Sequence, residues 1–262
     1  MAIKVVKIGG NVVDSPELLE KFCRDFAALE GEKVLVHGGG KIASDLQRRL
    51  GMEPQMIEGR RVTDPETLQI VTMVYAGWCS KHITALLQKY DCNAMGVSGC
   101  DASLITATRR SPKLLSDKVT VVDYGLVGDV NPLGVNVERV RWMIEGGVVP
   151  VFNAINHNRA GDLLNTNADT IASSLAVALG AELVYCFELP GVLLDRNDPS
   201  SVIPSLDFKE YERLKAEGKV AGGMIPKLDN SFDAIREGAA CVTIKHSSDL
   251  LREDAGTKLK LR

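Results

Sequence analysis

The stretch Ile3-Lys4-Val5-Val6-Lys7-Ile8-Gly9-Gly10 decides how the rest of the chain is organised. Its apolar residues, interrupted by lysines, predict a strand that ends on paired glycines. Ser15-Pro16 then predicts the start of a helix, with the serine as N-cap and the proline as first helical residue. A strand that leads through glycines to a helix can bring bare backbone N–H groups up to a phosphate, and Lys7 adds a cation beside them. Taken alone, the pattern also fits an ordinary tight turn.

The same pattern occurs a second time. Lys33–His37 predicts another strand, which is followed by Gly38-Gly39-Gly40 and a helix to about Leu50. Two such turns at the ends of neighbouring parallel strands form one concave surface of amide donors. The sequence contains no G-x-x-x-x-G-K-[ST], no G-x-S-x-G, and no G-x-G-x-x-G near the first strand. These absences argue against a Walker-type loop, a lipase-like nucleophile and a dinucleotide fold.

Composition narrows the class of protein. The 262 residues carry a formal net charge of -3, so there is no basic field to recruit nucleic acid or a membrane surface. We find no apolar run of membrane-spanning length, and the first residues predict a strand rather than an export signal. The six cysteines are scattered without C-x-x-C spacing, as expected for reduced thiols. We therefore expect a cytoplasmic protein.

The segment from Met56 to Pro65 contains Gly59-Arg60-Arg61 and predicts a hairpin or lid that presents guanidinium groups. Arginine suits two parallel hydrogen bonds to a carboxylate, although a solvated surface pair would look the same. Asp64-Pro65 then predicts the start of a long helix to about Tyr90. Short β-patterned runs in residues 103–130 predict hairpins at the edge of the main sheet.

Two later segments also combine polar residues with a helix start. In Asn165-Thr166-Asn167-Ala168-Asp169 there are more polar side chains than N-capping needs, which favours a binding role. Gly222-Gly223 precedes the last long helix, in whose first turns Lys227 opposes the helix dipole unless an anion lies nearby. The alternation of strands and helices predicts an α/β fold, and the part from about residue 180 onward has the character of a separate lobe.

In their order and spacing, these motifs resemble the amino-acid kinase family, and within it the kinases of N-acetyl-L-glutamate. The resemblance covers essentially the whole chain and rests on Lys7–Gly10, His37–Gly40, Gly59–Asp64, Asn165–Asp169 and Gly222–Lys227. It implies a three-layer αβα sandwich around a mainly parallel sheet. Residues 1–180 would form an N-terminal lobe for the acyl-glutamate and for dimerisation, and residues 181–262 a C-terminal lobe for ATP and Mg²⁺.

The implied activity is transfer of the γ-phosphoryl group of ATP to the γ-carboxylate of an N-acyl-L-glutamate, the second step of arginine biosynthesis. By resemblance, Lys7 and Lys227 would neutralise charge on the transferring group, and Asp169 would hold their ammonium groups in place. The resemblance assigns phosphate binding to Gly9 and Gly10, and substrate binding to Gly39, Gly40, Arg60, Arg61, Asn165 and Asn167. The implied nucleotide contacts are Glu188, Leu189, Gly191, Val192, Leu193, Lys219, Val220, Ala221 and Gly223. No metal ligand from the protein is implied.

Three departures from the family pattern lie near the expected acyl group. Arg60 replaces a leucine, the Ser-Gly-x-Asp-Gly pattern ends in Ala102, and Phe152-Asn153-Ala154 replaces small residues and a proline. These departures raise the hypothesis of a larger or charged acyl group, such as N-succinyl, whose extra carboxylate Arg60 could pair with. The alternative is that Arg60 points to solvent.

We also expect a homodimer that is insensitive to arginine, because the N-terminal helix of arginine-inhibited hexameric members is missing. Two further alternatives remain at this stage. One is another kinase of this fold, acting on carbamate, aspartate, glutamate or a nucleotide monophosphate. The other is a non-catalytic amino-acid sensor, although a sensor would be expected to have lost one of the two lysines.

Overall fold

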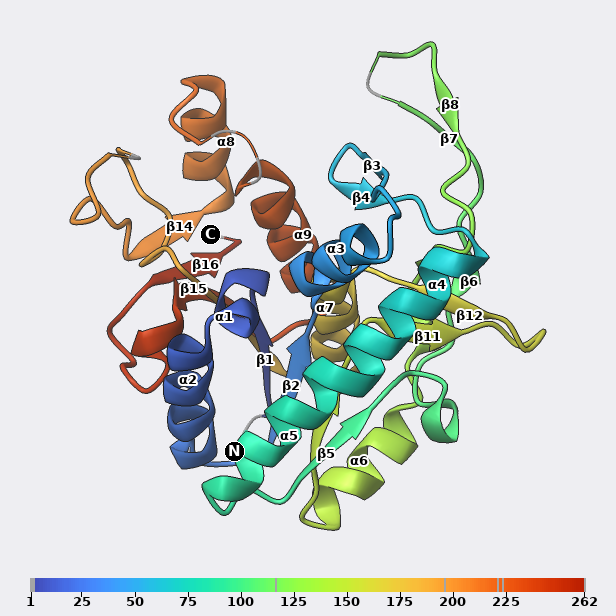
Figure 1. The fold of residues 1–262 in the computed structure, drawn as a ribbon. Coiled ribbons are helices and arrows are strands. Elements are labelled where there is room, and N and C mark those ends of the chain that lie inside the picture. Colours follow the sequence, from blue (N-terminus) through green and yellow to red (C-terminus); the bar gives the residue numbers. More distant parts are fainter. Residues whose placement is uncertain (1–2, 116, 196, 221, 223, 262) are drawn as a thin grey trace.

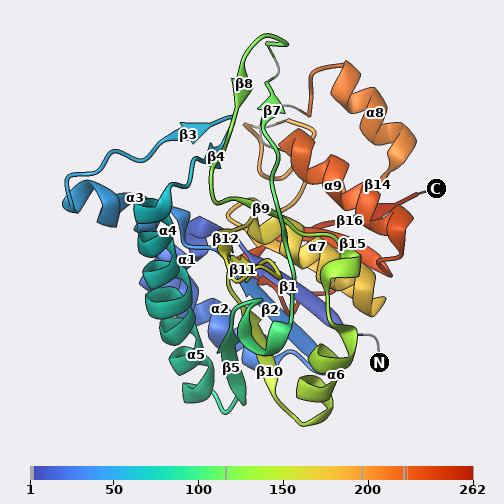
Figure 2. The same cartoon turned by 90° about the vertical axis from the view of Figure 1, so that its right-hand side faces the viewer.

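The computed structural model describes residues 3–115, 117–195, 197–220, 222 and 224–261. Figures 1 and 2 show a twisted sheet with helices on both of its faces. The predicted αβα sandwich around a mainly parallel sheet is therefore confirmed.

The central sheet has eight strands. In spatial order they are β14 (Ser205–Asp207), β16 (Thr257–Lys260), β15 (Cys241–His246), β13 (Glu182–Phe187), β1 (Lys4–Ile8), β2 (Lys33–His37), β10 (Val149–Phe152) and β5 (Ala94–Val97). In the described part of the chain, β15 and β16 form the single antiparallel pair of this sheet. Strand β1 lies in the middle, between β13 and β2, with Lys7 opposite Tyr185 and Val36. Central parallel strands are buried on both faces, which is why β2 and β13 read as nearly continuous apolar runs.

The helices form the two outer layers. In Figure 2 one side of the sheet carries α1 (Gly10–Asp14), α2 (Pro16–Ala28), α3 (Gly40–Arg49), α4 (Pro65–Thr72) and α5 (Ser80–Lys89). The other side carries α6 (Val137–Glu145), α7 (Ala168–Leu179), α8 (Phe208–Ala216) and α9 (Met224–Glu237). Three short 3₁₀ turns occupy Asp101–Ser103, Pro132–Gly134 and Ser247–Asp249.

Two predicted helix starts have the expected caps. Ser15 Oγ accepts a hydrogen bond from the Leu18 backbone N–H at 3.4 Å, and Asp64 Oδ1 accepts one from Thr67 at 2.7 Å. In both cases proline is the first helical residue. A side-chain oxygen at the N-cap accepts from one of the backbone donors that the first turn leaves without a partner. The short helix α1, directly after the first glycine turn, was not predicted.

The helix predicted from Pro65 to about Tyr90 is continuous, but its middle is a π-helical segment, Met73–Cys79, between α4 and α5. Such wider turns inside α-helices are rare and occur often at functional sites. Tyr75 and Cys79 of this segment are the residues that pack against the second glycine turn.

Residues 103–130 form antiparallel ribbons, as predicted, but they do not extend the main sheet. Strand β6 (Thr108–Arg109) pairs with β9 (Gly128–Asp129), and β7 (Lys113–Leu114) pairs with β8 (Val121–Val122) in an arm that projects from the body in Figures 1 and 2. The expectation of edge hairpins was wrong in this respect, because these short strands pair only with one another, in separate two-stranded sheets. Two further ribbons join β3 (Met56–Ile57) to β4 (Arg60–Arg61) and β11 (Ile155–His157) to β12 (Leu163–Asn165).

Among the described helices, none combines the length and the apolar composition needed to cross a bilayer.

Candidate active site

Lys7 and Asp169 form a nearly buried ion pair at the centre of the molecule. Successive strand side chains alternate between the faces of a sheet, so Lys7 points away from the face of Val6 and Ile8, toward α7. Its Nζ lies 2.6 Å from Oδ1 of Asp169, in the first turn of α7. The side chains are 9% and 22% exposed, respectively, so water screens the pair weakly.

Lys227 approaches the same place from the other half of the sheet. It lies in the first turns of α9, and its Nζ lies 3.2 Å from the centroid of the Phe187 ring. Lys7 Nζ lies 5.3 Å from the same centroid. The structure therefore brings together the three predicted catalytic residues, whose sequence positions span most of the chain.

The electrostatics of this cluster favour an additional anion. Burial alone would raise the pKa of Asp169, but the charge of Lys7, its hydrogen bond and the charge of Lys227 hold the pKa below its ordinary value. Burial lowers the pKa of Lys227 to about 8, and the nearby Asp169 only partly opposes this shift. Asp169 pairs directly with Lys7 alone, and Lys227 has no ion-pair partner among the described residues. A phosphate would supply negative charge where these two ammonium groups lie.

The glycine turns border this cluster, but they contribute unequally. The Gly9 N–H donates to the Cys186 carbonyl at 3.0 Å, so Gly9 has no free amide. The missing side chain of Gly9 leaves space for the Phe187 ring, because a Cβ at residue 9 would lie 3.1 Å from Cδ1 of Phe187. Gly10 and Gly40 open α1 and α3, where the first backbone N–H groups have no acceptor within the helix.

Gly39 is held against the π-helical segment. A Cβ at this position would lie 2.9 Å from both Cys79 Sγ and Tyr75 Cδ1, distances that real side chains do not adopt. Only glycine lets the turn approach the helix this closely. The segment Met73–Cys79 therefore fixes the position of the second glycine turn.

Arg61, predicted to bind the substrate, is already engaged in the fold. Its two Nη groups donate to Gln47 Oε1, to the Gly40 carbonyl at 2.8 Å and to Ser44 Oγ at 2.7 Å. These bonds attach the β3–β4 ribbon to α3 and to the glycine turn. They use part of the five-donor guanidinium fork of Arg61, which also lines a hollow described below.

The two predicted asparagines have different partners. Asn167 Oδ1 caps α7 by accepting from the backbone N–H groups of Asp169 at 2.8 Å and Thr170 at 3.2 Å. Asn165 instead donates through Nδ2 to Thr63 Oγ1 at 3.0 Å. Of the polar residues in this segment, Asn167 therefore does the capping, while Asp169 pairs with Lys7 and Asn165 with Thr63.

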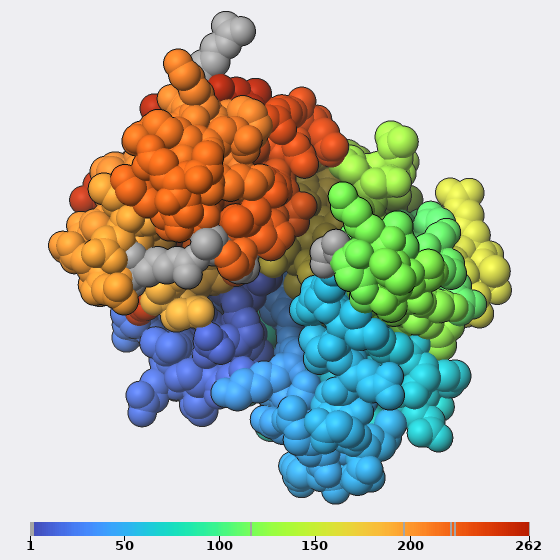
Figure 3. Space-filling view, turned by 90° about the horizontal axis from the view of Figure 1, so that it is seen from above, coloured from blue at the N-terminus to red at the C-terminus, as the bar shows by residue number. Residues whose placement is uncertain are grey.

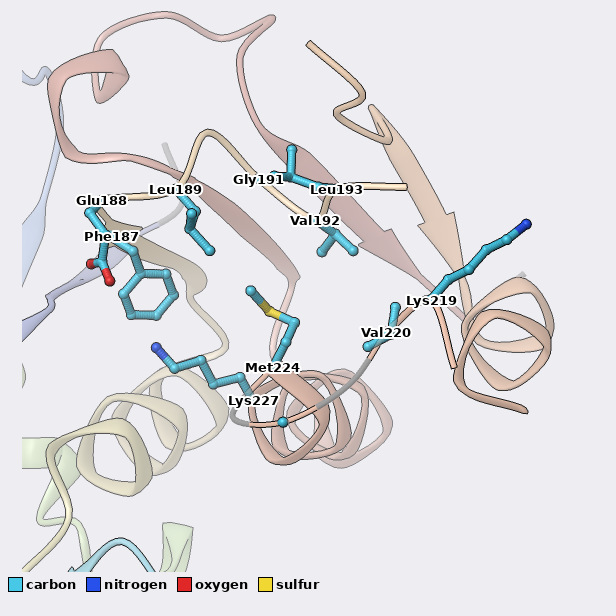
Figure 4. A pocket seen from close by; sticks show the side chains of 11 residues that line it. Phe187, Glu188, Leu189, Gly191, Val192, Leu193, Lys219, Val220, Met224 and Lys227 are labelled. Carbon is cyan, nitrogen blue, oxygen red and sulfur yellow. The ribbon is translucent and has the colours of Figure 1, made fainter. Parts of the chain in front are cut away.

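A hollow of about 410 Å³ lies on one side of the cluster (Figure 4). We call it the nucleotide hollow, after the nucleotide contacts that the sequence predicts in its lining. Its lining includes the predicted residues Glu188, Leu189, Gly191, Val192, Leu193, Lys219 and Val220, together with Phe187, Gly222, Met224 and Lys227. The Lys219 side chain points away from the hollow in Figure 4, and its Nζ pairs with Glu217 at 3.0 Å. The predicted contacts Ala221 and Gly223 lie outside the described residues.

A second hollow, of about 220 Å³, lies on the other side. We call it the acceptor hollow, after the substrate contacts that the sequence predicts in its lining. Its lining includes the predicted residues Gly39, Gly40, Arg60, Arg61, Asn165 and Asn167. In Figure 3 the surface is indented between the C-terminal half and the N-terminal half. Lys227 lines the nucleotide hollow and Ala168, next to Asp169, lines the acceptor hollow, so the charged cluster lies where the two meet.

Sequence reasoning missed Phe187, whose ring lies against both lysines, and the Gln47 and Ser44 partners of Arg61. For Phe187 there was one usable signal, because it immediately precedes the predicted nucleotide segment at the end of a buried strand. Nothing in the sequence marks Gln47 or Ser44.

Among the described residues, no group of three or more histidine, cysteine, aspartate or glutamate side chains could hold a metal ion. Mg²⁺ is often bound by few carboxylates and by substrate phosphates. Asp169, the carboxylate of the cluster, fits that arrangement better than a metal cage of protein ligands.

Comparison with known proteins agrees with this geometry. The model of the Amino acid kinase family matches residues 2–246. The acetylglutamate kinase of Cytophaga hutchinsonii is 47% identical, with 97% of each chain covered. The acetylglutamate kinase of Bacteroides thetaiotaomicron is 46% identical, with 98% of each chain covered.

Solved structures share the fold. The protein smu.665 from Streptococcus mutans superposes with a TM-score of 0.77 at 25% identity, covering 99% of both chains. Carbamate kinase from Giardia lamblia bound to AMP-PNP superposes with a TM-score of 0.70 at 14% identity, covering 98% of both chains. The second likeness is one of fold alone.

Fold, site and relatives together define an enzyme, a kinase that phosphorylates a carboxyl group. The chain belongs to the amino acid kinase family.

Proposed function

We propose that this protein transfers the γ-phosphoryl group of ATP to the γ-carboxylate of an N-acyl-L-glutamate, the second step of arginine biosynthesis. The observation that carries the proposal is the Lys7–Asp169–Lys227 cluster at the junction of two hollows. The two relatives described above, both named acetylglutamate kinase, support the same acceptor.

The chemistry suits these residues. A glutamate γ-carboxylate has a pKa of about 4.3 and is ionised at pH 7, so the enzyme needs no general base to activate it. The histidine nearest the glycine turns, His37, is fully buried, and burial lowers its pKa to about 4. Its Nδ1 lies 2.7 Å from the Gly38 carbonyl oxygen, so it is a neutral structural group. Rate enhancement then depends on alignment and on fixed positive charge around a loose transition state.

The chain's own residues divide these tasks. Lys7 and Lys227 place positive charge at the junction, and Asp169 fixes the Lys7 ammonium by direct contact. The amides of Gly10, Gly39 and Gly40 offer donors for phosphoryl and carboxylate oxygens. ATP supplies the phosphoryl group, and we propose that Mg²⁺ arrives with it.

We further propose a division of the chain into two lobes. Residues 1–180 would bind the acyl-glutamate through the acceptor hollow, and residues 181–262 would bind ATP through the nucleotide hollow. The apolar side chains of Leu189, Val192 and Met224 suit an adenine ring, and Lys227 lies at the end of the hollow where phosphates would reach the junction.

For the acyl group we propose N-succinyl, because Arg60 has the environment of an anion-binding residue. Arg60 is half-buried, and among the described residues it has no ion-pair partner. It lines both the acceptor hollow and an adjoining hollow of about 450 Å³, whose lining includes Arg109, Arg110 and Lys113. Burial, and then the charge of Arg110, lower the pKa of Arg60. The one carboxylate there, Asp129, is paired with Arg110.

The test is a coupled ADP-release assay with N-acetyl-, N-succinyl- and free L-glutamate, carbamate and aspartate. We expect turnover of the acyl-glutamates, with a higher kcat/KM for the succinyl compound. In Arg60→Leu, kcat/KM for N-succinyl-L-glutamate should fall about 10- to 100-fold, the worth of a charge-assisted hydrogen bond. The value for N-acetyl-L-glutamate should fall less.

The matched control is Arg48→Leu, which removes an exposed arginine of α3 and should leave both kcat/KM values unchanged. A clear preference of the unaltered enzyme for the acetyl compound would end the succinyl proposal. Turnover of carbamate, aspartate or free glutamate alone would replace the acyl-glutamate assignment.

We also propose a homodimer. Strand β5 is the last strand of the main sheet, and α5 packs against it. The π-helical segment that precedes α5 exposes two large side chains, Met73 at 61% and Trp78 at 63%. A second copy would cover this apolar face and the free strand edge. Sedimentation equilibrium should therefore give twice the 28.3 kDa chain mass. A monomer at micromolar concentration would contradict the proposal.

A further inference from the structure

Phe187 has no part in the roles assigned so far, although it lies at the junction of the two hollows. It is the last residue of β13 and is only 4% exposed. Its ring stacks on Tyr185 with centroids 5.8 Å apart, and its edge faces the backbone of Gly9. Among the described residues that line the nucleotide hollow, it is the single aromatic one.

Both lysine ammonium groups lie against this ring. Lys227 Nζ is 3.2 Å from its centroid and Lys7 Nζ is 5.3 Å from the same centroid, so the two nitrogens are at most 8.5 Å apart. Figure 4 shows the Lys227 side chain reaching across the hollow to the ring. Within the described part of the chain, Lys227 Nζ donates no hydrogen bond and joins no ion pair, because Asp169 is paired with Lys7.

This arrangement needs a stabilising partner for Lys227. Lys227 is half-buried, and a half-buried ammonium without a hydrogen-bond acceptor in the protein is unfavourable. A second ammonium nearby adds repulsion. The face of an aromatic ring carries partial negative charge and attracts a cation within about 6 Å of its centroid. An aliphatic side chain of similar size would fill the same space without attracting the ammonium.

We propose that Phe187 is a positioning residue for phosphoryl transfer, whose ring face holds the Lys227 ammonium at the junction and beside Lys7. The ring keeps the two like charges converged, so that they are already in place where the nucleotide's terminal phosphate meets the acceptor. This inference rests on the proposed function to the extent that Lys227 must meet a nucleotide phosphate.

A purely structural role would predict something different. Packing against Tyr185 and Gly9 explains why residue 187 is large and apolar, and leucine could satisfy much of that need. Packing does not explain why an ammonium lies over the ring face. The charged groups that face Lys227 are Asp169 on α7, Lys7 on β1 and Glu188 after β13, and all of them remain in a leucine variant.

The test compares Phe187→Leu with Phe187→Tyr, which keeps the aromatic face. In Phe187→Leu, kcat should fall about 5- to 30-fold, the range of one cation–π contact at a desolvated site, and KM for ATP should change less. Without the ring, the protonated form of Lys227 is less stable and its pKa falls. The alkaline limb of the pH profile of kcat should therefore move to lower pH by about half a unit to one unit. Phe187→Tyr should keep the kcat of the unaltered protein and the pH at which its alkaline limb falls.

The matched control is Phe26→Leu. Phe26 is a buried phenylalanine of α2 whose ring has Lys33 Nζ 5.2 Å from its centroid, and it does not line either hollow. This variant should lose thermal stability but keep kcat and the pH profile. An unchanged alkaline limb in Phe187→Leu, or equal losses in the leucine and tyrosine variants, would overturn the positioning role.

Nucleotide binding separates this inference from the proposed function. ADP titrated calorimetrically between pH 6.5 and 9 should bind the unaltered protein, with an affinity that falls on the alkaline side. If ADP binds but no acyl-glutamate is phosphorylated, the proposed function fails. The role of Phe187 can still be decided in that case, by comparing the pH dependence of ADP affinity in Phe187→Leu with that of the unaltered protein. If Phe187→Leu binds ADP with the pH dependence of the unaltered protein, the inference about Phe187 fails.

Discussion

In Lys227→Ala, kcat should fall by about 10²- to 10³-fold while KM for ATP rises much less. Lys227 is the one cation of the cluster that is not neutralised by direct contact with Asp169, so its charge is free to meet the phosphoryl group. Removing one preorganised donor from a site where negative charge develops costs about this much in rate. Steady-state kinetics with varied ATP would separate the two parameters.

Lys7→Ala should also lower kcat more than it raises KM for ATP, but it should destabilise the protein as well. The substitution leaves the buried Asp169 carboxylate without its partner 2.6 Å away. Lys89→Ala is the matched control, because Lys89 belongs to an exposed pair with Glu20 and should have no effect on the kinetics. Near-normal kcat in Lys227→Ala or Lys7→Ala would show that the assigned role of that lysine is wrong.

Asp169→Asn should lower kcat by about 10²-fold at pH 8, and lowering the pH should restore part of the activity. Asp169 is the carboxylate that raises the pKa of Lys227 against the effect of burial. Without it, the pKa of Lys227 falls below about 8, and more of the lysine is neutral at a given pH. Acidification returns the proton, so the ratio of variant to unaltered kcat should rise from pH 8 to pH 6.5.

Asp162→Asn is the control for this prediction. Asp162 is an exposed aspartate after β11 that bonds to Asn158, and its replacement should leave the kcat profile unchanged. A variant-to-unaltered ratio for Asp169→Asn that stays constant across this pH range would show that Asp169 does not act through Lys227.

The fold was predictable wherever a local pattern coincided with its physical cause. Ser15-Pro16 and Asp64-Pro65 combine an N-cap oxygen with a residue preorganised for the first turn, and both helices start where predicted. The strands β1 and β2 could be read from apolar runs that end on glycines. The short helix α1 was missed, because it has no apolar period long enough to predict it. The hairpins predicted in residues 103–130 do form, but they build separate ribbons instead of edge strands.

The site was predictable in its residues but not in their partners. The resemblance identified Lys7, Asp169 and Lys227, and the structure brings them together. The contact of Phe187 with Lys227 depends on how β13 and α9 pack, which no local pattern encodes. The same holds for Arg61, whose buried bonds to α3 cannot be inferred from the Arg-Arg pair itself.

The most direct test of the central claim is hydroxylamine trapping of the product formed from ATP and an N-acyl-L-glutamate. An acyl phosphate at the γ-carboxylate reacts to a hydroxamate, which mass spectrometry identifies. The unaltered protein should yield the γ-hydroxamate in amounts equal to the ADP released, and Lys227→Ala should yield about 10²- to 10³-fold less per unit time. ADP release without any hydroxamate, or no turnover of any N-acyl-L-glutamate, would contradict phosphoryl transfer to a carboxylate at this site.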